Sequence, residues 1–175
     1  IGVTSIAAGG DLILTDSGGA TFGAVNADAV TLTSTTGTIA FQGVTTFDTG
    51  LTGSADGYNL SFTGGTTTIA GDTNLTHTGT LTLGDGGDTL TFTGGLDTTG
   101  VGGQVNVGGT VGTDGAQMDL GAITLTATSE LLTDVSTAAG AILNVGAVTG
   151  GNNQLTLDGG TGGAVTASGN ISAVQ

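Results

Sequence analysis

The chain has 175 residues, of which 37 are glycine and none is proline or cysteine, and it carries fourteen acidic residues but no lysine or arginine. The net charge of −14 excludes nucleic-acid binding and attraction to anionic membranes, because both require cationic side chains. The lack of cysteine excludes disulfides and thiolate metal sites, and the lack of proline argues against a disordered linker.

Short runs of alternating apolar and polar residues, closed by glycine or aspartate, follow one another along the whole chain. Such runs are typical of half-buried β-strands that end in turns. Frequent glycine and β-branched threonine disfavour helix, and the one stretch where a helical turn competes is 129–139. The expected strands are, in order, 1–8, 11–15, 21–25, 28–33, 38–42, 44–47, several short strands within 58–95, then 104–107, 118–120, 123–128, 131–135, 141–148, 154–157, 164–167 and 171–174.

One short motif occurs twice in the central stretch, as LSFTGG at 60–65 and as LTFTGG at 90–95. A single strand of this kind cannot bury its apolar side, but coils stacked on one another bury it in a continuous column. The residues expected in that column are Leu60, Phe62, Ile69, Leu75, Leu81, Leu83, Leu90 and Phe92.

The pattern predicts an all-β parallel solenoid of roughly eight coils, each of about 18 to 24 residues with three short faces. No composition shift or linker interrupts it, so residues 1–175 are interpreted as one solenoid section, an excerpt or repeat unit of a longer chain or filament. No apolar run reaches the length of a membrane span. The coil positions expected to match one another are Ile39, Leu60, Leu81, Val105, Ile123, Leu143 and Val165.

Runs such as LTFTGGLDTTG, QVNVGGTV, MDLGAITLTAT and AGAILNVGAVTGGNNQLTLDGGTGG resemble the repeat regions of large bacterial surface and secreted proteins of the filamentous-haemagglutinin and autotransporter-adhesin type. The similarity lies in the general pattern of these runs and not in a single diagnostic motif, and it covers essentially the whole chain. It implies a right-handed parallel β-helix, export to the bacterial cell surface, and service as a stalk, fibre or adhesin shaft.

The segment 83–91, LGDGGDTLT, matches the calcium-binding nonapeptide pattern GGxGxDxLx at all but its first specified position. Glycines in that pattern let the backbone wrap an ion, and aspartate supplies oxygen ligands. A working site shares ligands between consecutive repeats, and neither flank continues the pattern. Asp85 and Asp88 are therefore the only candidate metal ligands, and an Asp-Gly turn without metal is the favoured interpretation; no other cofactor is expected.

Threonines that alternate with the expected core residues face outward. Such rows on a solenoid can order water and bind ice, or carry O-linked sugars, although threonine is also simply a good solvent-facing strand residue. The outward set comprises Thr31, Thr33, Thr80, Thr82, Thr89, Thr91, Thr93, Thr124, Thr126 and Thr128.

His77 shares the parity of Leu75 and Leu81, so it is expected inside or at a corner. A single histidine without a positioned nucleophile is no catalytic group, and the chain is not expected to be an enzyme.

The sequence instead favours a mechanical role as an extracellular rod, fibre subunit or adhesin shaft of a bacterial surface. Uncapped strand edges would join copies head to tail, and the edge residues are Ile1, Val3, Ile171 and Val174. The alternative is a ligand-binding solenoid, either an ice-binding threonine face or a calcium-stabilised adhesin module.

Overall fold

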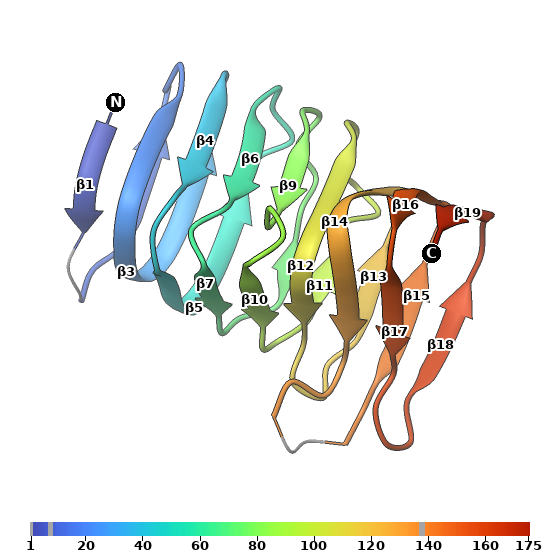
Figure 1. Ribbon diagram of the computed structural model, residues 1–175. Helices are drawn as coiled ribbons and strands as arrows, with labels where there is room; N and C mark the ends of the chain where they lie inside the picture. Colours follow the sequence, from blue (N-terminus) through green and yellow to red (C-terminus); the bar gives the residue numbers. More distant parts are fainter. Residues whose placement is uncertain (1, 7–8, 137–138) are drawn as a thin grey trace.

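The computed structural model describes residues 2–6, 9–136 and 139–175, and these form an all-β parallel solenoid of about eight turns (Figure 1). All pairings between named strands are parallel, and each strand pairs with the equivalent strand one coil away. The described residues include no helix, and thus none that could cross a membrane. The expected solenoid is confirmed, and 129–139 forms no helical turn within its described part, because β14 (Ile123–Leu132) continues through its beginning.

Three faces run along the solenoid axis. Face A comprises β1 (Gly2–Ile6), the start of β3 (Ala20–Thr33), β4 (Thr38–Phe41), β6 (Asn59–Phe62), β9 (Leu81–Leu83), the starts of β12 (Val105–Gly112) and β14, β16 (Val148–Asn153) and β19 (Ile171–Val174). Face B comprises the middle of β3, the start of β5 (Thr45–Gly53), β7 (Thr66–Ile69), β10 (Thr89–Phe92), the ends of β12 and β14, and β17 (Leu155–Asp158).

Face C begins with β2 (Leu12–Thr15) and the ends of β3 and β5. It continues as a separate five-stranded sheet of β8 (Thr73–Asn74), β11 (Leu96–Asp97), β13 (Met118–Leu120), β15 (Ile142–Val145) and β18 (Ala164–Ala167). Strand β3 runs through all three faces without a break.

The coil spacing on face A ranges from 18 residues, between Val105 and Ile123, to 25 residues, between Ile123 and Val148. The sequence correctly placed Ile39, Leu60, Leu81, Val105 and Ile123 in one column. It was wrong for Leu143 and Val165, which pair with each other on face C, whereas Val148 and Ile171 continue the column of Ile123. Apolar pairs look alike on every face, and only the lengths of the corners decide which face a pair occupies.

The interior is the predicted apolar column. All eight expected core residues, from Leu60 to Phe92, are at most 1% exposed. An aromatic stack runs through the first coils: the Phe41 ring lies 5.2 Å from that of Phe22 and 5.0 Å from that of Phe62, nearly parallel to both, while Phe47 meets it edge-on at 5.4 Å. Offset and edge-to-face contacts of this kind stabilise a core beyond simple burial.

Several threonines point inward, which the alternation pattern did not predict. Thr35, Thr45, Thr73 and Ser129 are buried near corners, and each hydroxyl donates to the carbonyl oxygen two residues earlier, at 3.2, 2.9, 3.3 and 2.9 Å. A buried hydroxyl is tolerated when it is hydrogen-bonded. Threonine therefore serves two positions in this fold, the solvent-facing row and the inner side of a turn.

Candidate functional site

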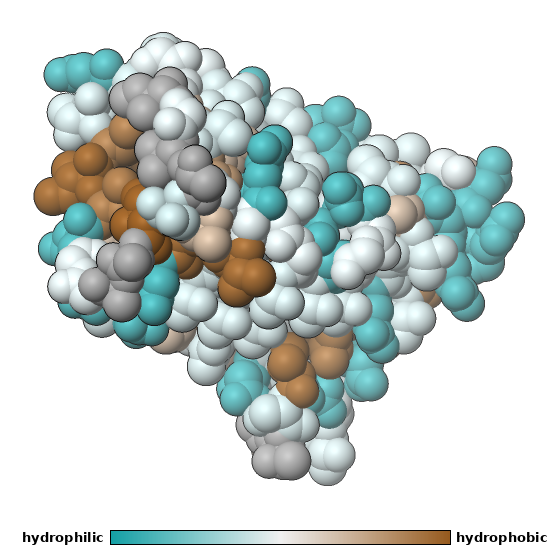
Figure 2. Space-filling model, turned by 60° about the vertical axis from the view of Figure 1, so that its left-hand side comes forward, coloured by the Kyte–Doolittle hydropathy of each residue, from teal (hydrophilic) through white to brown (hydrophobic). Residues whose placement is uncertain are grey.

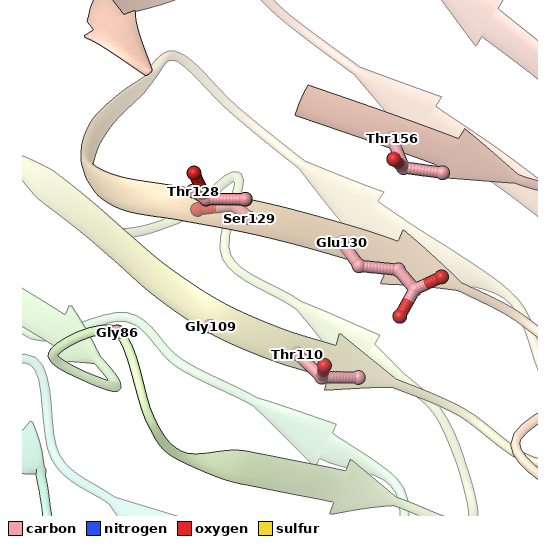
Figure 3. Close-up of a pocket in the computed structure, with 7 residues that line it drawn as sticks. All are labelled: Gly86, Gly109, Thr110, Thr128, Ser129, Glu130 and Thr156. Carbon is pink, nitrogen blue, oxygen red and sulfur yellow. The ribbon is translucent and has the colours of Figure 1, made fainter. Parts of the chain in front are cut away.

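A hollow of about 310 Å³ lies at the corner between faces A and B (Figure 3). Its cause is a difference in corner length. Strand β12 crosses the corner with only residues 108 and 109, whereas the coil before it uses residues 84–88 and the coil after it uses 126–129. The two longer corners stand on either side of the shorter one, and the residues lining the space are Gly86, Gly109, Thr110, Thr128, Ser129, Glu130 and Thr156.

The chemistry of the hollow is one carboxylate among hydroxyl groups. Glu130 and Thr156 are exposed, and they lie on adjacent coils as register partners. The Ser129 hydroxyl is already engaged, because it donates to the carbonyl oxygens of Val107 and Ala127. The lining thus offers hydroxyl and backbone groups for hydrogen bonding, together with one negative charge at Glu130.

The two candidate calcium ligands lie in the corner next to the hollow, but they face different surroundings. Asp88 is buried, and its carboxylate accepts hydrogen bonds from the backbone N–H of Gly65 at 2.7 Å and of Asp85 at 2.9 Å. Asp85 itself is exposed. Asp88 thus ties its own corner to the preceding coil, as charge-assisted bonds to backbone amides do.

Within the described residues, no group of three or more histidine, aspartate or glutamate side chains is placed to hold a metal ion. Both Asp88 oxygens are already hydrogen-bonded to backbone amides, so the calcium interpretation gains no support and stays a prediction. The structure explains the LGDGGD sequence as a corner closed by a buried carboxylate.

His77 lies in the interior, as its parity predicted. The side chain is fully buried, its ring stacks on Tyr58 with the centroids 4.8 Å apart, and neither ring nitrogen has a hydrogen-bond partner. Burial lowers the pKa of His77, and the nearby backbone of Thr80 offsets this only in part. Burial, followed by the charge of Asp56, raises the pKa of Tyr58 to about 12.

The outward threonines of face B form two ranks along the axis. Thr66, Thr89 and Thr110 are register partners in one rank, and Thr46, Thr68 and Thr91 form the second, two residues further along each strand. Glu130 replaces threonine in the next coil of the first rank. Face A is more mixed, with Ser61, Thr82, Asn106, Thr124 and Thr149 in one row. The ordered part of the threonine array is therefore limited to β5, β7, β10 and β12.

Within the described residues, both axial ends of the solenoid present strands with one unpaired edge. At one end β1 and β2 pair only with β3, and at the other β17, β18 and β19 pair only with the preceding coil. The last coil exposes apolar side chains, with Val165 at 44%, Ile171 at 42% and Val174 at 38%.

At the first end Ile13 is 64% exposed, and Figure 2 shows apolar side chains gathered there. Of the predicted edge residues, Ile171 and Val174 lie on the outer strand of the last coil and Val3 lies in β1, whereas Ile1 lies outside the described residues.

No family model, curated protein or solved structure matches the chain. The evidence for function therefore comes from the solenoid itself: its open ends, its threonine ranks and its buried histidine.

Proposed function

We propose that the chain is a structural module, a stiff extracellular rod that serves as a fibre subunit or adhesin shaft on a bacterial surface. The resemblance of its repeats to filamentous-haemagglutinin and autotransporter-adhesin proteins favours this location. Parallel ladders run along the axis on all three faces, and a continuous apolar column fills the interior. Such quasi-one-dimensional stacking gives a rod whose coils each contact only their neighbours.

The observation that carries the proposal is the state of the two axial ends. Each presents unpaired strand edges together with apolar side chains of the core column: Ile6 and Leu12, which are only partly buried, at one end, and Val165 and Ile171 at the other. Solenoids that stay monomeric cover such ends with polar caps, and open edges pair with further strands. The partner we propose is more of the same solenoid, either further coils of a longer chain or another copy stacked head to tail.

The absence of lysine and arginine suits this role in a second way. Trypsin-like proteases cleave after those residues, so the module offers them no site. The high negative charge keeps the sides of neighbouring rods apart, so association is directed to the ends, where the strand edges are free.

The test is assembly of the purified module. We expect light scattering to show species that lengthen with concentration at physiological salt, and electron microscopy to show unbranched filaments one solenoid wide. The double variant Val165→Lys/Ile171→Lys places charges on the last coil and should leave monomers. The matched control is Val44→Lys, which removes a still more exposed apolar side chain (58%) from a corner away from the ends. Monomers at every concentration of the unmodified module would refute head-to-tail assembly.

A second candidate function is ice binding by face B, and it is favoured by the two threonine ranks on β5, β7, β10 and β12. A flat parallel sheet repeats hydroxyl and methyl groups at the coil spacing of about 4.8 Å, which can order a layer of water. We expect thermal hysteresis in solution that Thr89→Tyr reduces by more than half and Thr149→Tyr, on face A, leaves unchanged. A solution with no thermal hysteresis would remove this candidate.

A further inference from the structure

The interior of the solenoid holds one titratable ring that nothing in the proposed rod function uses. His77 follows β8, in the fourth coil, where every neighbouring coil contributes apolar side chains to the same column. The imidazole is fully buried, and neither Nδ1 nor Nε2 has a hydrogen-bond partner. Among buried side chains of the described residues, only Thr98 shares this lack of a partner. Orphaned polar atoms of this kind are rare and call for an explanation.

We propose that His77 is an acid-sensitive weak point: uptake of a proton by its imidazole opens the coils around it, so the middle of the rod loosens in mildly acidic surroundings. The proposal is independent of head-to-tail assembly, because it concerns the stability of a single module.

The backbone of Thr80 favours the charged ring, but its effect is smaller than that of burial, and no side chain around the ring is hydrogen-bonded to it. The segment before β6 contributes Tyr58, whose ring stacks on His77, and Asp56, whose carboxylate is bonded by the Ser54 hydroxyl. Neither is a hydrogen-bond partner of the imidazole. An imidazolium in this position would be a buried charge with no carboxylate partner, which is costly in an apolar interior.

The coil on the other side contributes no side chain that is hydrogen-bonded to the ring either. It contributes Thr98, which is itself without a partner, and Asp97, whose Oδ1 accepts from the backbone N–H of Thr99 at 2.8 Å and from its hydroxyl at 2.6 Å. On its own segment His77 follows Thr73, Asn74 and Thr76, which carry no charge. The nearest acidic residue on that side in sequence is Asp72, which is exposed. The proton would therefore have no counter-charge within the column.

The direction of the effect follows from linkage between protonation and folding. Burial places the pKa of His77 below its ordinary value of 6.5, so as the pH falls below 6.5 the unfolded chain binds the proton first. Stability that is fully present above pH 6.5 is then lost as the pH falls towards the folded pKa. Over that window the unfolding equilibrium constant rises by up to tenfold for each pH unit.

The composition makes the test unusually direct. The chain has one histidine, one tyrosine and no tryptophan, so the imidazole signals in an NMR titration and the intrinsic fluorescence both arise from this stack alone. We expect the folded module to show a His77 pKa below 6.5, and the Tyr58 emission to change with the same midpoint. A folded pKa of 6.5 or higher would overturn the proposal without any variant.

The variants His77→Leu and His77→Phe provide the second readout, since two replacements of different shape guard against one that packs badly. We expect the melting temperature of the unmodified module to fall between pH 7 and pH 5 relative to both variants. Hydrogen exchange locates the opening: the Gly102 amide, which donates to the His77 carbonyl at 2.9 Å, should lose protection before the Thr63 amide, which donates to Phe41 at 3.0 Å. Identical pH dependence in variants and parent would refute the proposal.

Discussion

Replacement of Phe41 by alanine is expected to lower the free energy of unfolding by about 4 kcal/mol, at the upper end of the range for large-to-small core substitutions. Phe41 is fully buried and contacts three other rings, those of Phe22, Phe47 and Phe62. The substitution leaves a cavity in the middle of a stack that spans three consecutive coils. Because each coil is held only by its neighbours, the structure has little freedom to collapse around the gap.

The measurement is urea denaturation followed by circular dichroism. The matched control is Phe92→Ala, which removes an equally buried ring that has no aromatic contact among the described residues. Aromatic pairs contribute about 0.5–1.5 kcal/mol beyond burial, so Phe41→Ala should be the more costly change by about 1 kcal/mol or more. Equal losses for the two variants would show that the stack adds nothing to simple burial.

The core and the coil repeat could be predicted from sequence because they depend on local alternation. Leu60, Phe62, Leu81 and Leu83 each lie two residues from their partner, and this period of two fixes which side chains point inward. Parallel stacking is the simplest way to bury one side of such short strands, because each coil then covers the apolar side chains of the next.

The assignment of strands to faces could not be predicted in the same way. Leu143 and Val165 have the same local pattern as Val148 and Ile171, yet the two pairs lie on different faces. The difference lies in the corners, whose length varies from coil to coil and whose residues carry no periodic signal. The hollow beside Glu130 escaped prediction for the same reason, since it exists only because one corner is shorter than its two neighbours.

For the candidate site residues, the sequence predicted some features of their surroundings but not their hydrogen-bond partners. Asp88 lies in a motif that suggests calcium binding, but in the structure its carboxylate accepts hydrogen bonds from two backbone amides. The sequence contained a signal for this, the lack of matching repeats on either side. For His77 the parity of the strand predicted burial correctly, whereas the missing hydrogen-bond partners became visible only in three dimensions.

Substitution of Gly64 by alanine is expected to destabilise the solenoid by about 3 kcal/mol, the upper part of the range for overpacking. A Cβ atom at Gly64 would lie 2.3 Å from the backbone nitrogen and oxygen of Gly43, and one at Gly43 would lie 2.5 Å from the backbone nitrogen of Ala24. Glycines at equivalent corners thus let three successive coils approach backbone to backbone. Since backbone atoms cannot rotate away as a flexible side chain can, the coils themselves would have to separate.

Two neighbouring glycines separate this role from the conformational one. Gly65 has a φ of +88° and open space around its Cα, so Gly65→Ala should cost only the left-handed backbone penalty of about 1–2 kcal/mol. Gly87 has neither constraint, and Gly87→Ala should be neutral or slightly stabilising because it restricts the unfolded chain.

Thermal or urea unfolding of the three variants should therefore rank Gly64→Ala as the most damaging and Gly87→Ala as the least. If Gly65→Ala proved the worst, glycine would serve this fold mainly by permitting turns. The expected order instead makes close contact between coil backbones the reason that glycine is so frequent in the chain.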